Sequence, residues 1–344
     1  MDSVYSKKNR TRKYSSSIIP DVLIEVSDYT FYMHKHLLAN NSIYLRRLIE
    51  EHSNEENDLC AFTLDIPGGA ATFKVIVKYF YGQNFELTSS NIISVLCAVC
   101  LLDMTDNYTR KSLISQAERF LSKEIFPYWK ETMEALIACE DILNHADEVG
   151  LASACLVSLA YKVTNQNSQC PDWWFEDVCS LNLHLFKRFV KVLGEIGHDP
   201  ANISNAVIYY ANHYDLGADP NSSGIWYREE RKLLEEMVYL LPAQKGATST
   251  KLLLSLLSFS IMLNANEKCI EILEKRIGVQ LGTGGLVMLL VTNSRDKSQG
   301  QLGIGSIKRI IEHFVDEHYA GSQGEEIQIR FLAFVFSACG FLLG

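Results

Sequence analysis

The first strongly patterned stretch of the chain reads Asp21-Val-Leu-Ile-Glu-Val26-Ser-Asp-Tyr-Thr-Phe-Tyr-Met33. Its residues alternate with an apolar bias, and many of them are β-branched or aromatic, which is typical of half-buried strands. Ser27 and Asp28 lie between the two halves and favour a tight turn. The stretch therefore predicts two short strands, over residues 21–26 and 30–33, joined by that turn.

Two short helices and a third strand are predicted next. Ser42 is the expected N-cap of the second helix, because a serine oxygen accepts a hydrogen bond from the first backbone N–H groups of a helix. Pro67-Gly68-Gly69 is expected to stop the third strand. The predicted elements are a helix over 35–39, a helix over 43–51 and a strand over 62–66. This mixed order differs from the strand–helix alternation of a nucleotide-binding sheet.

From residue 70 onward apolar residues recur at helical spacing, and strands largely disappear. Residues 307–315 carry one apolar stripe. Residues 250–263 are apolar nearly all round, which predicts the central buried helix of a second domain. The predicted helices cover 70–81, 91–104, 113–126, 132–145, 151–164, 181–193, 202–213, 229–241, 250–263, 267–278 and 307–319. The sequence thus predicts an α+β domain followed by an all-α domain, and a predominantly helical chain.

The composition is that of a folded, acidic protein. The 344 residues include 47% apolar residues and carry a net charge of −9, which argues against nucleic acid as a partner. No apolar stretch is long enough to span a membrane, and the N-terminus lacks the apolar core of a signal peptide. The nine scattered cysteines indicate reduced thiols in a cytosolic compartment.

A basic arm opens the chain and opposes the acidic average. Its cationic residues lie among serine and asparagine: Lys7, Lys8, Arg10, Arg12 and Lys13. We interpret residues 1–20 as a solvated, disordered tail, because such polar runs do not pack. The alternative is a patch for nuclear import or for anionic lipids.

No motif indicates catalysis, a cofactor or a bound metal. Cys97-x-x-Cys100 resembles a redox pair or half a zinc site, but no second Cys/His pair lies at ligand spacing. Both cysteines are expected to face the core of one helix. His34-x-His36 has a spacing that points the two rings in different directions on a helix, so we do not expect a metal there.

An aromatic cluster, Trp173-Trp174-Phe175, is flanked by acids and opens the second half of the chain. Large aromatic side chains dominate the binding energy of many interfaces, so the cluster is a candidate anchor for a client protein. The favoured alternative is a packing role at the entrance to the second domain.

Motifs along most of the chain resemble a single family. Residues 21–49 have the strand–strand–helix opening of a BTB (POZ) domain. Three further motifs resemble the variant BTB domain of the plant non-phototropic-hypocotyl / root-phototropism family. They are Leu64-Asp-Ile-Pro-Gly-Gly-Ala70-x-x-Phe73, Lys78-Tyr-Phe-Tyr-Gly82 and Glu86-Leu-Thr-Ser-Ser-Asn91-Ile92. Three motifs in the second half of the chain resemble the helical domain of the same family. They are Asp172-Trp-Trp-Phe175-Glu-Asp177-Val178, Leu240-Leu-Pro242-x-x-Lys245-Gly246 and Glu274-x-Arg276-Ile277-Gly278.

The resemblance implies four segments and a function. We expect a disordered arm over 1–20, a BTB/POZ domain over 21–125, a helical extension and linker over 126–168, and the family's helical domain over 169–344. The implied function is that of a non-enzymatic, substrate-specific adaptor of a cullin-3 ubiquitin ligase, with phototropin-like kinases as clients. Dimerisation through the BTB domain and a location in the cytoplasm or at the plasma-membrane periphery are also implied. The alternative is a dimeric signalling scaffold without ligase function.

The chain also departs from the family pattern. Cullin-binding BTB domains of other families carry an apolar residue, any residue and then an acid, whereas this chain has Leu87-Thr88-Ser89. The scaffold-binding surface implied by the resemblance consists of Tyr81, Phe85, Leu87 and Ser89. The family's Tyr-containing motif and coiled-coil tail are not found before Gly344, so we expect a C-terminally shortened form. The apolar run 331–343 is expected to be a core helix.

Overall fold

A computed structural model describes residues 5–7, 20–52, 59–104, 112–165, 170–213, 224–282, 302 and 304–319. The chain divides into two compact units, residues 1–162 and 163–344. Residues 166–168 of the predicted extension and linker, and the predicted helix over 331–343, lie outside the described residues.

The first unit begins with a four-stranded sheet in the order β1-β3-β2-β4. Strands β2 and β3 form the expected antiparallel hairpin, and Ser27 takes a left-handed φ of 51° in its turn. Strand β4 pairs parallel to β2 on the other side. The strands are β1 (Tyr5–Lys7), β2 (Val22–Val26), β3 (Tyr29–Met33) and β4 (Cys60–Thr63). The predicted alternation is confirmed, with β2 burying every second residue.

Strand β1 corrects the prediction that residues 1–20 are a disordered arm. Residues Tyr5 to Lys7 pair antiparallel with β3, in a register that places Tyr5 opposite Phe31. The pairing satisfies backbone groups at the outer edge of β3, which would otherwise be an unpaired sheet edge. A three-residue strand is too short to show alternation in the sequence. The other basic residues of the arm, from Lys8 to Lys13, lie outside the described residues.

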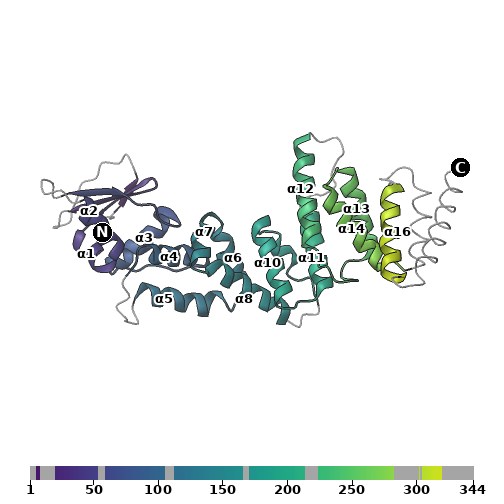
Figure 1. The fold of residues 1–344 in the computed structure, drawn as a ribbon. Helices are drawn as coiled ribbons and strands as arrows, with labels where there is room; N and C mark the ends of the chain where they lie inside the picture. The colour runs from purple at the N-terminus through teal and green to yellow at the C-terminus, as the bar shows by residue number, and fades with distance from the viewer. Residues whose placement is uncertain are drawn as a thin grey trace. The chain divides into compact units, whose positions relative to one another are not determined.

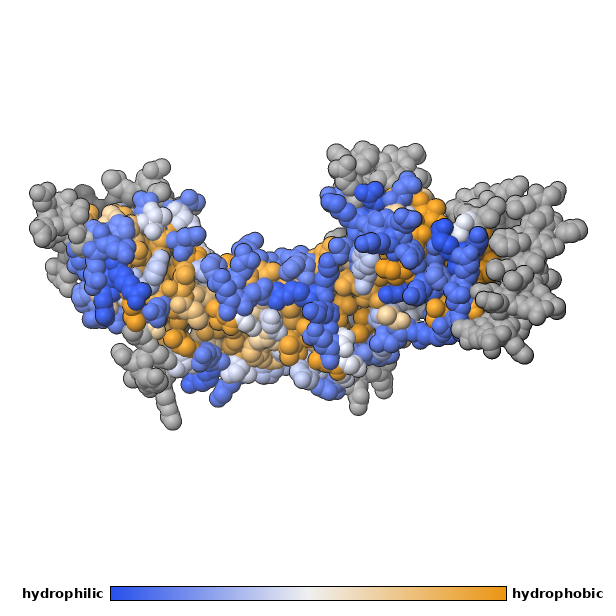
Figure 2. Space-filling model, in the orientation of Figure 1, coloured by the Kyte–Doolittle hydropathy of each residue, from blue (hydrophilic) through white to orange (hydrophobic). Residues whose placement is uncertain are grey.

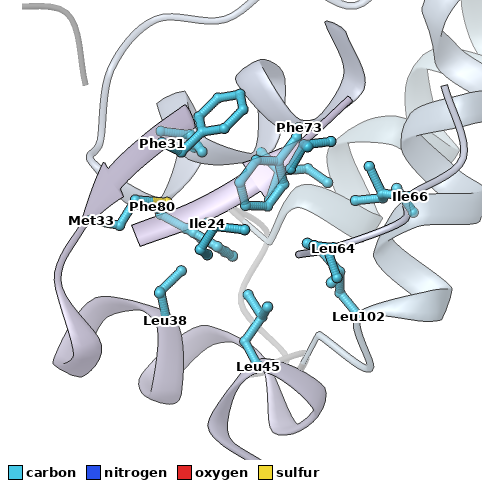
Figure 3. Close-up of a cluster of buried hydrophobic side chains, with 14 of the residues drawn as sticks. Ile24, Phe31, Met33, Leu38, Leu45, Leu64, Ile66, Phe73, Phe80 and Leu102 are labelled. Atoms are coloured by element: carbon cyan, nitrogen blue, oxygen red, sulfur yellow. The ribbon is translucent and has the colours of Figure 1, made fainter. Parts of the chain in front are cut away.

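The core of the sheet domain gathers side chains from strands and helices that are far apart in the sequence. In Figure 3, Ile24 and Phe31 from the sheet lie among Leu45 and Phe73 from two helices and Leu102, which directly follows a third. The rings of Phe31 and Phe73 meet edge to face, with centroids 4.8 Å apart. This packing closes the sheet against its helices and confirms the α+β character of the domain.

Ser42 caps α2 as predicted and also connects two parts of the unit. Its Oγ accepts a hydrogen bond from the backbone N–H of Leu45 (3.0 Å) and donates one to the carbonyl of Leu102. The helices of this unit are α1 (Lys35–Asn41), α2 (Ile43–His52), α3 (Gly69–Phe80), α4 (Ser89–Leu101), α5 (Leu113–Phe120), the π-helical turn η1 (Leu121–Ile125), α6 (Trp129–Ala138), the 3-10 turn η2 (Glu140–Ile142), α7 (Leu143–Glu148) and α8 (Leu151–Asn165), the last of which crosses the unit boundary.

The prediction of one continuous helix over 132–145 is wrong. Helix α6 ends at Ala138, and the chain passes through η2 before α7 begins at Leu143. Cys139 at the break is fully buried, as is Ala146 on α7, so the bend keeps both residues in the core. Helical spacing in the sequence continues across the break, and the pattern therefore did not reveal it.

The described elements of the second unit are all helical, as predicted (Figure 1). The helices are α9 (Phe175–Val178), α10 (Leu183–Glu195), α11 (Pro200–His213), α12 (Gly224–Leu240), α13 (Thr250–Met262), α14 (Glu267–Gln280) and α16 (Ile304–Tyr319). Neighbouring helices pack in sequence order from α10 to α14, and α14 packs on α16.

Helix α13 is not the central buried helix that its composition predicted. Leu253, Leu257 and Ser260 are buried, but Phe259 and Met262 are 40% and 51% exposed. Leu252 and Leu256, with these two exposed residues, line an apolar groove between α11, α12 and α13. The helix therefore has one buried side and one open apolar side.

Helices α14 and α16 lie side by side in Figure 1, and two features hold them together. The buried carboxylate of Glu274 accepts a bidentate pair of hydrogen bonds from Arg309, at 2.6 Å from Nε and 2.9 Å from Nη2. One turn later, a Cβ on Gly278 would lie 2.6 Å from both the Ile310 carbonyl oxygen and His313 Cβ. The helices thus approach so closely that only glycine fits at this position.

We predict that Gly278→Ala destabilises the second unit by about 1–3 kcal/mol, because the added methyl group forces α16 away from α14. The matched control is Gly194→Ala in α10, where a Cβ would meet nothing within 4 Å. That change should leave stability unaltered or raise it by up to about 1 kcal/mol, since alanine favours helix over glycine. Urea unfolding of both variants, followed by circular dichroism, checks the pair. Equal effects of the two substitutions would contradict the close approach.

Candidate interaction surfaces

The loop from Tyr81 to Thr88 joins α3 to α4 and carries most of the surface predicted to bind a scaffold. Gly82, one residue beyond the C-cap Tyr81 of α3, takes a left-handed φ of 61°, as expected for a glycine that ends a helix. Tyr81, Phe85 and Leu87 are half-buried and pack against the core of the sheet domain. The three apolar members of the predicted surface are thus neighbours on one loop, partly open to solvent and fixed by packing.

Tyr81 is the most strongly positioned residue of this loop. Its hydroxyl forms a 2.8 Å hydrogen bond with Nδ1 of His34, the residue just before α1. Burial raises the pKa of Tyr81 to about 12; a hydrogen bond from the backbone of His34 opposes the rise, and the nearby Asp21 carboxylate adds to it. The neutral phenol is therefore the form that the folded domain stabilises.

Ser89 does not belong to the open part of the surface. It is buried at the start of α4, and its hydroxyl donates a hydrogen bond to Oε2 of Glu131 on α6. Thr88 just before it caps α4, and its backbone N–H donates to Oδ1 of Asn91 (2.9 Å). The Leu87-Thr88-Ser89 segment is thus fixed at a helix N-terminus, with a carboxylate beside it.

Glu131 is a candidate residue that the sequence patterns missed. It is 42 positions away from Ser89 in the chain, and it is partly exposed. No local motif connects the two residues, because their contact depends on how α6 packs on α4. The carboxylate that is missing from the segment after Leu87 is therefore present in space, contributed by another helix.

The aromatic cluster opens the second unit, and its three residues are not equivalent. Trp174 is 0% exposed, and its ring meets those of Phe175, Phe189 and His198. Phe175 is also buried, whereas Trp173 is half-buried. Two of the three side chains therefore pack inside the unit, and Trp173 is the member of the cluster with the more accessible ring.

Apolar side chains also reach the surface of the first unit beyond the sheet. Figure 2 shows apolar residues at the surface along the helices that follow the sheet domain. The exposed large apolar side chains here are Tyr128, Ile137, Val149, Val157 and Tyr161. Singly exposed apolar side chains are normal on protein surfaces, so these residues do not by themselves define a binding site.

The cysteine motif has the geometry of a packing element. Cys97 is buried, and burial raises the pKa of its thiol to about 12, which makes it a poor nucleophile. Cys100 is exposed, so the expectation that both thiols face the core is wrong. No group of three or more His, Cys, Asp or Glu residues suited to a metal ion occurs in the described parts of the chain. None of the helices described is long and apolar enough to cross a membrane.

Comparison with known proteins identifies matches in both units. The BTB/POZ domain matches residues 10–124, and the NPH3 family matches residues 172–333. The BTB/POZ domain-containing protein At5g03250 of Arabidopsis thaliana is 34% identical over 90% of this chain and 60% of its own length. Root phototropism protein 2 of the same plant is 31% identical over 92% of this chain and 56% of its own length. The chain thus spans less than two thirds of the length of these relatives.

We predict that Tyr81→Phe lowers the free energy of unfolding by about 0.5–1.5 kcal/mol near neutral pH, because the bond to His34 is lost. Because the pKa of Tyr81 is raised in the folded state, its neutral phenol stabilises the fold fully below the ordinary tyrosine pKa. This stabilisation is lost as the pH rises through about 12. The stability difference between the wild type and the variant should therefore shrink as the pH rises from about 10 to about 12. Chemical unfolding at several pH values measures it. A difference that is constant over this range would contradict the proposed environment of Tyr81.

Proposed function

Because the chain belongs to the NPH3 family of BTB/POZ-domain proteins, we propose that it is a non-enzymatic adaptor that recruits client proteins to a cullin-3 ubiquitin ligase. The BTB/POZ domain is a module of protein–protein interaction and dimerisation. In this proposal the first unit binds the ligase scaffold and the second unit binds the client. Dimerisation would place two client sites on one ligase, which increases the effective affinity for the client.

The observation that carries the proposal is the composition of the surface after α3. Tyr81, Phe85 and Leu87 present apolar area on a loop that is fixed by packing, and Glu131 adds a carboxylate at its end. A partly buried apolar centre with a charged group at its edge is the usual anatomy of a specific protein interface. Preorganisation of the loop by the bond between Tyr81 and His34 lowers the entropy cost of binding.

A relative's name suggests the class of client. Root phototropism protein 2 is among the similar proteins, and phototropin-like kinases are the corresponding client class in our proposal. We also propose a location in the cytoplasm or at the periphery of the plasma membrane. Trp173 is the member of the aromatic cluster best placed to contact a client, because its ring is only half-buried.

One observation favours a second function, that of a dimeric signalling scaffold without ligase activity. The position at which other cullin-binding BTB domains carry an acid is Ser89, and this serine is buried. If Glu131 cannot replace that acid, the first unit would still dimerise, and the second would still bind photoreceptor or transport proteins. The two functions differ in one measurable property, the affinity for cullin-3.

We predict that the purified chain binds the N-terminal part of cullin-3 with micromolar or better affinity, and that Leu87→Asp weakens binding by at least about tenfold. Glu131→Gln should weaken binding by about three- to tenfold, because it removes the charge while keeping a side chain that can accept the bond from Ser89. Glu134→Gln is the matched control, since Glu134 is an exposed acid on the same helix. Titration calorimetry measures all four proteins.

Thermal unfolding of the variants separates a local effect from a loss of folding, which matters for Leu87 because it also packs on the core. Binding that is lost in Leu87→Asp and unchanged in Glu134→Gln supports the adaptor function. An absence of binding by the wild-type chain at about 100 μM would reject it and favour the dimeric scaffold.

A further inference from the structure

Two clefts flank the segment that joins α12 to α13, and they share the lining residues Pro242 and Gln244. The first, of about 700 Å³, lies between α10, the start of α11 and the end of α12. The second, of about 400 Å³, lies between the joining segment and α14. Both clefts belong to the second unit, so their geometry does not depend on how the two units are placed.

Basic side chains line both clefts. In the first they are His184, Lys187, Arg188, Lys191 and His198. In the second they are Lys245, Lys275 and Arg276. Among the described residues no carboxylate lines either cleft. The whole chain has 41 acidic against 32 lysine and arginine residues, so a run of basic side chains without an acid is a local concentration of positive charge.

Arg276, which lines the second cleft, has a donor without an acceptor. Its Nη2 donates to the carbonyl of Leu241 at 2.9 Å, which fixes the guanidinium group. Its Nη1 is buried and has no hydrogen-bond partner. An unpaired buried donor of a charged group is costly, and a carboxylate is the acceptor that best fits the fork of an arginine.

The acids near the clefts do not neutralise them strongly. Lys187 pairs with Glu236 (2.5 Å), Lys191 with Glu195 (3.8 Å) and Lys245 with Glu317 (3.6 Å). In each pair both side chains are 40% exposed or more. Exposed ion pairs contribute at most about 1 kcal/mol, so a ligand carboxylate can replace these partners at little cost.

We propose that the two clefts together bind an acidic, extended peptide segment of the client protein, with its carboxylates on Lys191, Lys275 and Arg276. The proposal rests on the client-recruiting function given above and names the chemical class of the client segment. Apolar residues also line the clefts, among them Val190, Ile203 and Val279. A segment that alternates acidic and apolar residues suits this lining, because an extended chain places alternate side chains on opposite sides.

The first test uses the full chain and a fluorescein-labelled peptide of about twelve residues that alternates Glu with Ala or Leu. The control peptide has Gln in place of every Glu. Fluorescence polarisation should show binding of the Glu peptide only, and its affinity should fall when salt is raised from about 50 mM to about 200 mM. Equal affinity for the two peptides, or none for the Glu peptide at about 100 μM, would overturn the proposal.

The second test uses charge reversal at exposed positions that hold no buried contact. Lys191→Glu combined with Lys275→Glu should weaken binding of the Glu peptide by at least about tenfold. The matched control, Lys232→Glu with Lys268→Glu, has the same net charge, and both of its sites are exposed and line neither cleft. Equal affinities of the two double variants would overturn the proposal. Arg276→Gln is a third variant, whose folding must be checked because Arg276 also bonds to Leu241.

Cullin-3 binding by the same variants separates the two proposals. The Lys191/Lys275 variant should bind cullin-3 like the wild type, because the changes lie in the second unit. A chain that binds the Glu peptide at these clefts but not cullin-3 supports the peptide site and rejects the ligase adaptor. A chain that binds cullin-3 while its Glu-peptide affinity is unaffected by the reversal rejects the peptide site alone.

Discussion

Helix α4 is apolar on every side, and the first unit is organised around the need to cover it. All residues from Ile92 to Val99 are buried. A helix without a polar face is stable in water only if other elements pack on all of its sides. Helix α3 covers it from the sheet domain, while α5, α6 and α7 cover the rest. The helices that follow the sheet are therefore not a separate appendage. They complete the core that the sheet domain begins, which is why the first compact unit extends to residue 162.

This shared burial also explains where the candidate scaffold surface comes from. The N-terminus of α4 is the point at which the loop after α3 meets a residue of α6. Leu87 lies next to it along the chain, and Glu131 reaches it through packing. A carboxylate at a helix N-terminus is favoured by the partial positive charge of the unpaired N–H groups. The position of Glu131 thus follows from the same packing that buries α4, and the surface combines parts of the chain that no local motif connects.

The sequence predicted what depends on local spacing and missed what depends on neighbours. Strands β2 and β3, the cap at Ser42 and most helices were predicted, because alternation, capping and helical spacing are properties of short segments. Strand β1 was missed because three residues show no period. The contact of Ser89 with Glu131 was missed because it joins distant positions. Helices α4 and α13 are both apolar nearly all round in sequence, yet α4 is covered on all sides and α13 leaves Phe259 and Met262 exposed. Composition indicates how much surface a helix could bury, but the number of its neighbours depends on the tertiary structure.

In the second unit the contact between α14 and α16 determines which side chains of α14 face the segment after α12. Glu274 and Gly278 lie one turn apart and share the face that packs on α16. Arg276 lies between them in sequence, and two positions along a helix turn a side chain to nearly the opposite side. The bidentate bond to Arg309 and the close approach at Gly278 therefore fix the rotation of α14, and with it the direction of Arg276 toward the segment after α12. The partner of the buried carboxylate lies within the unit, whereas one guanidinium nitrogen on the opposite face has no partner. The same helix thus has one face committed to folding and another with unused hydrogen-bonding capacity, and the second face lines the basic cleft.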